Sequence, residues 1–101
     1  MDKGTVGIIG SGTMGRGIAQ VAAGVGYNVI LNDISSELVC RSVERLEHDL
    51  ARLVEKGKME DGERGALLSR VQSSSDVRDM EKADIIVEAI FEDLETKKQV
   101  F

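Results

Sequence analysis

The apolar residues of this chain first recur as short runs. Val6–Ile9 ends at a glycine, Gly10, and Val29–Leu31 ends at the polar pair Asn32–Asp33. Short apolar runs without alternating polar positions are typical of strands buried on both faces, as in a parallel sheet. We therefore predict two core strands, each followed by a turn.

After each run the spacing of apolar residues becomes helical. They recur every three or four positions over Met14–Val25. A longer stripe over Leu38–Val54 follows Ser35 or Ser36, either of which can cap a helix. A weaker helix is predicted over Asp61–Arg70. The positions expected to face the core are Met14, Ile18, Val21, Ala22, Val25, Leu38, Val43, Leu46, Leu50, Leu53 and Val54.

The last third of the chain adds two more predicted strands. A short one covers Val71–Ser73, and a polar connection with one helical turn follows over Ser74–Ala83. Ala83–Ile90 is the clearest strand of all, and Leu94–Phe101 begins another helix. Alternating strands and helices imply crossovers, so we predict an α/β fold with a doubly wound parallel sheet and a helical hairpin inserted after the second strand.

Composition and charge narrow the function classes. The 101 residues carry a net charge of −5, whereas nucleic-acid binding requires clustered lysine and arginine. The single cysteine, Cys40, can form no internal disulfide, which fits a reducing compartment. We find neither a signal-peptide pattern nor an apolar run near the roughly 20 residues that span a membrane. We therefore expect one cytoplasmic domain, with no nucleic-acid partner and no metal site.

The turn after the first predicted strand reads G-S-G-T-M-G, the G-x-G-x-x-G pattern of dinucleotide-binding domains. Gly10 permits a tight turn, Gly12 leaves room for a pyrophosphate, and Gly15 lets the helix pack close to the strand. The free N–H groups and the positive dipole end of the helix then bind the phosphates without a basic side chain. The candidate cofactor-binding residues of this turn are Gly10, Ser11, Gly12, Thr13, Met14 and Gly15.

Asp33 lies 18 residues beyond Gly15, at the end of the second predicted strand. A carboxylate there can accept hydrogen bonds from both hydroxyls of an adenosine ribose, and its charge would repel a 2′-phosphate. Because Ile34–Ser36 contains no arginine, we predict NAD rather than NADP. Four strands are fewer than the six of a complete dinucleotide-binding sheet, so we interpret residues 1–101 as a truncated Rossmann-type domain.

The turn has two competing interpretations. A glycine-rich strand–helix turn can serve packing alone, with Asp33 as an ordinary strand-end residue. A Walker-type phosphate loop is excluded, because Gly15 is followed by Arg16 and Gly17 and the Gly-Lys-Ser/Thr ending is missing. Arg16 can contact a phosphate or lie in solvent on the helix.

The string GIIGSGTMGRGIAQVAAGVGYNVILND, residues 7–33, resembles the N-terminus of 3-hydroxyacyl-CoA dehydrogenases, including bacterial 3-hydroxybutyryl-CoA dehydrogenases. ADIIVEAIFEDLETKKQVF, residues 83–101, is similar to the family's E-A-x-x-E-x-x-x-x-K segment, and LSRVQSSSD, residues 68–76, to its leader into the third strand. The resemblance implies interconversion of a (3S)-3-hydroxyacyl-CoA and a 3-oxoacyl-CoA with NAD(H), with a short-chain butyryl substrate in fatty acid or butanoate metabolism.

The resemblance also implies further cofactor contacts. Ala89 and Ile90, at the end of the last predicted strand, lie where the family's backbone passes the cofactor. Glu92 matches a family carboxylate near the nicotinamide ribose, and Lys97 matches a lysine that contacts the dinucleotide. Taken from the residues alone, Glu92 and Lys97 would be a solvated pair at a helix start.

In the family the inserted hairpin faces the acyl-CoA substrate. Lys56 occupies a position that resembles a CoA contact, Lys58 lies nearby, and a lysine suits a phosphate as a point charge. A second family contact, a serine, appears here as Asp49. The alternative interpretation makes both lysines a solvated helix end.

We predict no catalytic residue in this chain. In the family the catalytic histidine and its glutamate partner lie further along, and the only histidine here, His48, lies on a polar stretch of the long helix. We interpret His48 as a surface residue and Cys40 as a packing residue. Homo-oligomers are expected only for the full-length parent.

The leading hypothesis is therefore an enzyme fragment. The alternative is a free-standing NAD-binding module without turnover, and the coding sequence downstream of Phe101 would distinguish the two. A dehydrogenase of the related 3-hydroxyisobutyrate type is a lesser alternative, because the G-I-A-Q continuation fits that family poorly.

Overall fold

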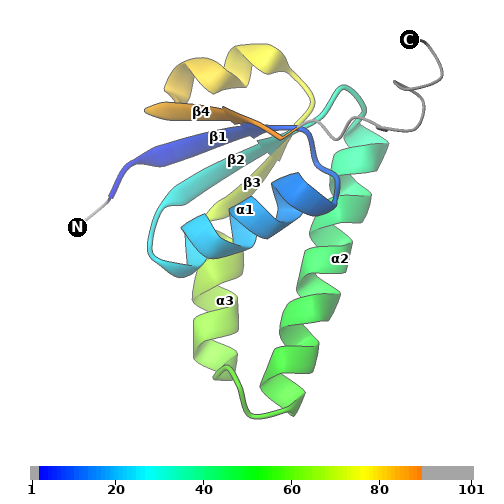
Figure 1. Ribbon diagram of the computed structural model, residues 1–101, viewed down its shortest axis with the longest axis vertical. Helices are drawn as coiled ribbons and strands as arrows, with labels where there is room; N and C mark the ends of the chain where they lie inside the picture. Colours follow the sequence, from blue (N-terminus) through cyan, green and yellow to red (C-terminus); the bar gives the residue numbers. More distant parts are fainter. Residues whose placement is uncertain (1–2, 90–101) are drawn as a thin grey trace, which may run out of the picture.

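A computed structural model describes residues 3–89, and Figure 1 shows how their elements are arranged. Four parallel strands form one sheet in the order β3-β2-β1-β4. The strands are β1 (Thr5–Ile9), β2 (Asn28–Asn32), β3 (Val71–Ser74) and β4 (Ile85–Glu88). The strand order reverses after β3, because β4 returns to the free side of β1. This reversal is the topology of a doubly wound sheet, so the predicted fold class is confirmed.

Helices lie on both faces of this sheet (Figure 1). α1 (Thr13–Gly24), α2 (Ser36–Glu55) and α3 (Asp61–Ser69) cover one face, and the short 3₁₀ helix η1 (Val77–Lys82) covers the other. α2 and α3 form the hairpin predicted after the second strand, and the hairpin extends beyond the sheet. No helix within residues 3–89 combines the length and apolarity that a membrane crossing needs.

The core lies between the sheet and α1 and α2. Ile8 and Leu31, from adjacent strands, are fully buried and belong to one cluster with Leu46 and Leu50 of α2. Burial of such a side chain contributes about 1.5–3 kcal/mol to folding. The apolar strand runs and the centre of the long helical stripe are thus core, as predicted.

The stripe predicted for α1 is wrong in part. Ile18 and Ala22 are partly buried against the core, but α1 turns mainly its small residues toward the sheet. Gly15, Ala19 and Ala23 are the buried positions, spaced four apart on one face. Small side chains let the helix approach the strands closely, and three of the larger apolar positions stay exposed. The exposed apolar residues of α1 and its C-terminal end are Met14, Val21 and Val25.

The cap of α2 is one of the two predicted, but the burial of its first turn differs from the prediction. Ser35 is the cap, since its hydroxyl accepts a hydrogen bond from the N–H of Leu38 at 3.4 Å. With that start, Val39 points into the core, whereas Leu38 is 45% exposed instead of buried. Cys40 is exposed as well, so its interpretation as a packing residue is wrong.

The last strand is shorter than predicted. β4 covers four residues instead of Ala83–Ile90, and Ile90 lies outside the described residues. Within residues 3–89, β4 pairs with β1 alone and forms one edge of the sheet. Ile85 and Ile86 are more than half exposed, so this edge of the described sheet is apolar.

Candidate dinucleotide site

The carboxyl ends of the strands surround a cavity of about 360 Å³. Its lining consists of Ile9, Gly10, Ser11, Gly12, Asn32, Asp33, Ile34 and Ala89. Because β1 and β2 are adjacent and parallel, the glycine turn after β1 lies beside Asp33 after β2. In open α/β sheets, ligands bind in the crevice outside the carboxyl ends of the strands, where the strand order reverses.

Gly10 and Gly15 have roles that the fold itself imposes. Gly10 has a φ of 108°, which side-chain-bearing residues rarely adopt, and its N–H donates to the Asn32 carbonyl at 2.8 Å. A Cβ on Gly15 would lie 1.8 Å from the Gly10 carbonyl oxygen. The tight turn and the close helix–strand packing predicted for these two glycines are therefore present.

Gly12 is a glycine for which the described residues give no structural reason. Its φ of −71° and ψ of −164° are open to any residue, and a Cβ there would have no atom within 4 Å. The space in front of it lies at the start of α1, which no side chain of residues 3–89 caps. A pyrophosphate fits this space, because the first-turn N–H groups and the helix dipole attract an anion.

Asp33 is held in place by the glycine turn. Its Oδ2 accepts hydrogen bonds from the Ser11 N–H at 2.9 Å and from the Ser11 hydroxyl at 2.7 Å. Its Oδ1 accepts one from the Ile34 N–H at 2.8 Å. A carboxylate has about four acceptor positions, so an acceptor position remains for a ribose hydroxyl. Ser11 itself is only 4% exposed, which makes this contact part of the built turn.

These hydrogen bonds also set the charge of Asp33. Partial burial acts to raise its pKa, but donation by the Ser11 hydroxyl, the Ser11 N–H and the Ile34 N–H outweighs it and holds the pKa below its ordinary value. Asp33 is therefore a carboxylate at neutral pH. A fixed, ionised acceptor at this position is what recognition of an adenosine ribose requires.

The other predicted cofactor residues do not all lie at the cavity beside Asp33. Thr13 and Met14 line a separate apolar cavity between α1 and Val6 of β1, and neither lines the cavity at Asp33. Ala89 is buried, and its N–H donates to the Ile9 carbonyl at 2.8 Å. Ile90, Glu92 and Lys97 lie outside the described residues.

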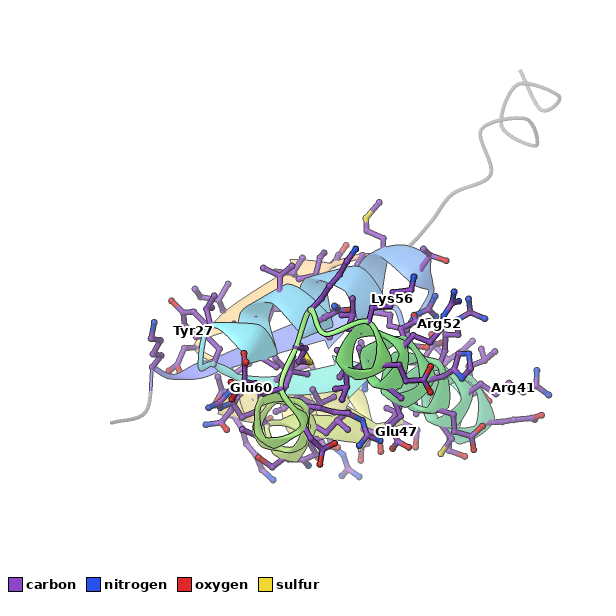
Figure 2. The ribbon with its side chains drawn as sticks, turned by 90° about the horizontal axis from the view of Figure 1, so that it is seen from below. Tyr27, Arg41, Glu47, Arg52, Lys56 and Glu60 are labelled. Atoms are coloured by element: carbon purple, nitrogen blue, oxygen red, sulfur yellow. The ribbon has the colours of Figure 1, made fainter. Side chains whose placement is uncertain are left out.

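Lys56 lies far from the cavity beside Asp33. It is an exposed residue at the end of α2, and Figure 2 shows it where the hairpin turns. Asp33 precedes the other end of that 20-residue helix, so roughly 30 Å separate the two at 1.5 Å per residue. His48 is exposed in the middle of α2 and does not line the cavity, as expected for a surface residue.

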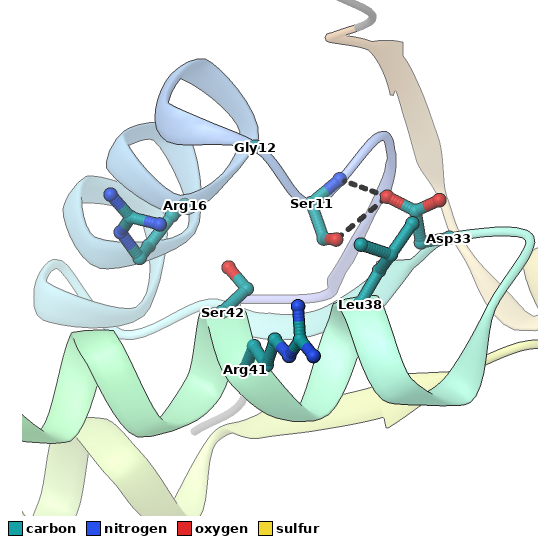
Figure 3. A pocket seen from close by; sticks show the side chains of 7 residues that line it. All are labelled: Ser11, Gly12, Arg16, Asp33, Leu38, Arg41 and Ser42. Atoms are coloured by element: carbon teal, nitrogen blue, oxygen red, sulfur yellow. Dashed lines mark hydrogen bonds between the residues drawn. The ribbon is translucent and has the colours of Figure 1, made fainter.

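Three residues on α2 that line a cavity were not predicted as site residues from the sequence. Leu38, Arg41 and Ser42 line a second cavity together with Arg16 of α1, on the other side of Asp33 (Figure 3). Their spacing of three and four after the Ser35 cap places them on one helix face. That spacing was a usable signal, but only the packing of α2 beside α1 brings Arg41 near Arg16.

Comparisons with known proteins agree with this geometry. Residues 5–101 match the sequence model of the family described as 3-hydroxyacyl-CoA dehydrogenase, NAD binding domain. A 3-hydroxyadipyl-CoA dehydrogenase of Escherichia coli is 41% identical over 96% of this chain and 20% of its own length. A probable 3-hydroxybutyryl-CoA dehydrogenase of Deinococcus radiodurans is 40% identical over 94% of this chain and 34% of its own.

A comparison with solved structures indicates the same family. The crystal structure of an (S)-3-hydroxybutyryl-CoA dehydrogenase from Ralstonia eutropha superposes with a TM-score of 0.84 at 40% identity, covering 95% of this chain and 34% of that one. The chain thus spans about a fifth to a third of the length of the relatives it matches. The match to the family's sequence model covers residues 5–101 of this chain, and the cofactor of this domain is NAD. The chain belongs to the family of 3-hydroxyacyl-CoA dehydrogenase NAD-binding domains.

Proposed function

We propose that this chain is the NAD-binding part, residues 1–101, of a longer oxidoreductase. The parent would interconvert a (3S)-3-hydroxyacyl-CoA and a 3-oxoacyl-CoA with NAD(H). The observation that carries the proposal is the pairing of Gly12 with Asp33: an open space at an uncapped helix start beside a fixed carboxylate. A packing turn would need neither feature, which is why the cofactor role is favoured over packing alone.

Each residue of the turn has a defined part in this proposal. The first N–H groups of α1 bind the pyrophosphate in front of Gly12, and Asp33 accepts a hydrogen bond from the adenosine ribose. Ser11 orients Asp33. NAD, when bound, supplies the acceptor for the hydride, and the protein's contribution is to bind and orient it. Ala89, Ile90, Glu92 and Lys97 are proposed as further contacts by their match to the family pattern.

The substrate and its surroundings are proposed from the relatives. Their names include butyryl and adipyl forms of 3-hydroxyacyl-CoA dehydrogenases, and we propose a short-chain substrate for the parent of this chain. Lys56 is proposed as a contact to a CoA phosphate. A cytoplasmic location and a role in fatty acid or butanoate metabolism accompany this assignment.

One experiment tests both the binding and the enzymatic part. NADH is titrated into the 101-residue chain by fluorescence, and NADH oxidation by acetoacetyl-CoA is followed in a spectrophotometer. We expect weak NADH binding and no turnover. Oxidation of a hydroxyl needs a base within hydrogen-bond reach of the reacting oxygen, and within residues 3–89 no histidine lines the cavity. Absence of NADH binding would contradict the proposal.

The alternative is a free-standing NAD-binding module. It predicts the same binding, but also that the complete natural coding sequence shows no turnover. If that longer protein oxidises NADH with acetoacetyl-CoA while residues 1–101 do not, the enzyme proposal holds. Turnover by the 101-residue chain that His48→Ala abolishes would show that His48 is the base and that its surface assignment is wrong.

A further inference from the structure

The apolar cavity between α1 and Val6 of β1 lies apart from the cavity beside Asp33, and the two share no lining residue. It has a volume of about 520 Å³, and none of the residues that line it is charged. Val21 is 69% exposed there, and Met14 and Val25 are exposed as well. A contiguous apolar region that stays open to solvent marks an interaction surface.

β4 extends this apolar region beyond the cavity. Ile85 pairs with Val6 in the parallel register of β4 and β1, so the two side chains point to the same face of the sheet. Val6 is buried, whereas Ile85 is 58% exposed, because α1 packs on β1 and β2 and β4 lies beyond β1 (Figure 1). We call this region the α1–β4 surface, and it consists of Met14, Gly17, Ile18, Val21, Val25 and Ile85.

Gly17 lies on this surface, and the packing of residues 3–89 gives no reason for a glycine there. It is inside α1, where glycine is less favourable than alanine, and a Cβ on it would meet no atom within 4 Å. Met14 precedes it by three residues and Val21 follows it by four, so all three lie on one helix face. A glycine between two larger apolar residues leaves room for the backbone of a second helix to approach closely.

The topology of the sheet restricts what can cover this surface. The steps from β1 to β2 and from β2 to β3 run in one direction across the sheet, with α1, α2 and α3 on one face. The step from β3 to β4 runs in the opposite direction, with η1 on the other face (Figure 1). Because such crossovers are right-handed, a connection from β4 to a further parallel strand beyond it would also lie on the face of η1. The cover for the α1–β4 surface must therefore come from another part of the protein.

We propose that the α1–β4 surface is the docking site for a helix from the remainder of the parent protein, with a bulky apolar side chain opposite Gly17. A helix suits this place, because each face of such a sheet is covered by helices that pack side by side. The relatives supply chain for it, since this chain covers only 20% and 34% of the length of two of them. The inference rests on the proposed function only in assuming a longer parent, and it does not involve the cofactor.

The test measures how fast a thiol on this surface reacts with N-ethylmaleimide, in the 101-residue chain and in the complete natural protein. Val21→Cys and Val25→Cys are the probes, one at a time, and Cys40, which is exposed on α2, is the internal control. In the 101-residue chain each probe should react about as fast as Cys40. In the complete protein it should react about tenfold more slowly or less, because the thiol reacts only when the helix undocks. Cys40 should react at the same rate in both proteins.

Gly17→Leu tests the close approach of the docked helix. In the 101-residue chain leucine should raise the unfolding midpoint, because it is a better helix former than glycine and has open space around it. In the complete protein it should lower the midpoint, because its side chain would occupy the place of the docked helix. Gly65→Leu is the matched control and should raise the midpoint of both proteins. Gly65 is also an exposed helix glycine whose Cβ would meet no atom, but it lies on α3.

Three outcomes would overturn the proposal. The first is that both probes react equally fast in the two proteins. The second is protection in the 101-residue chain that increases with its concentration, which would make a second copy of the chain the occupant. The third is a natural coding sequence that ends at Phe101. NADH titrated into the same samples separates this inference from the proposed function. NADH binding without protection contradicts only the docking site, and protection without NADH binding contradicts only the cofactor role.

Discussion

The glycine turn between β1 and α1 has an inner side, which faces the sheet, and an outer side, which faces the cavity at Asp33. On the inner side a Cβ at Gly15 would lie 1.8 Å from a backbone oxygen, whereas on the outer side a Cβ at Gly12 would contact nothing. Within one six-residue motif, two glycines are therefore present for different reasons. Packing requires a glycine at Gly15, whereas packing does not require one at Gly12, where we propose that the pyrophosphate binds.

Gly15→Val should have the largest effect on the inner side. The backbone of the turn must move to admit any side chain, and overpacking of this kind costs about 3 kcal/mol or more of unfolding free energy. Urea denaturation followed by circular dichroism measures the loss. Gly17→Ala is the control, because a Cβ at Gly17 meets no atom and alanine is about 1 kcal/mol better in a helix. A Gly15→Val chain as stable as the original would show that the close contact is not rigid.

Gly12→Val tests the outer side and should give the opposite result. The fold has room for the valine, so the denaturation midpoint should stay near that of the unchanged chain. The branched side chain would occupy the proposed pyrophosphate position, and NADH binding should disappear in a fluorescence titration. Unchanged NADH affinity in a folded Gly12→Val chain would rule out the phosphate role of this turn.

The strands and the positions of their ends were the part of the site that the sequence predicted best. Apolar runs identified the strands, and parallel pairing of β1 with β2 follows from the alternation of strands and helices. The positions of Gly10 and Asp33 at neighbouring strand ends could therefore be derived without coordinates. The links from Ser11 to Asp33 could not, because side-chain hydrogen bonds between separate loops leave no periodic trace.

Periodicity failed where small residues form the interface. The stripe through Met14 and Val21 has helical spacing, yet α1 packs through Gly15, Ala19 and Ala23. A pattern of large apolar residues indicates that a helix has an apolar side. Close packing on a sheet, however, favours the side of the helix that carries the smallest residues. The cavity of Arg16 and Arg41 was missed for a related reason, since it depends on how two helices lie against each other.

Asp33→Ala should weaken NADH binding by about tenfold to a hundredfold, less than Gly12→Val. A hydrogen bond to a charged group contributes about 1.5–3 kcal/mol, and the ribose loses its acceptor. Asp76→Ala is a suitable control, because Asp76 also has a lowered pKa but pairs with Arg78 and lines neither cavity. Equal affinity of the unchanged chain for NADPH and NADH would contradict the discrimination assigned to Asp33.

The smallest effect concerns the acid sensitivity that Ser11 gives to Asp33. Because hydrogen bonds hold the folded pKa of Asp33 below its ordinary value, this carboxylate stabilises the fold above about pH 4, and the contribution is lost as the pH falls through the folded pKa. Ser11→Ala removes the hydroxyl donor and moves that pKa upward.

Denaturation series between about pH 2 and pH 7 should therefore show a shallower loss of stability in acid for Ser11→Ala than for the unchanged chain. Asp76 adds its own acid dependence in both proteins, so the comparison is repeated on an Asp33→Asn background, where Ser11→Ala should change nothing. NADH affinity gives a second readout, because protonation of Asp33 removes the charged ribose acceptor and should begin at a higher pH in Ser11→Ala. Identical acid limbs in both proteins would mean that the two backbone N–H donors alone hold Asp33, and that the turn needs Ser11 only for packing.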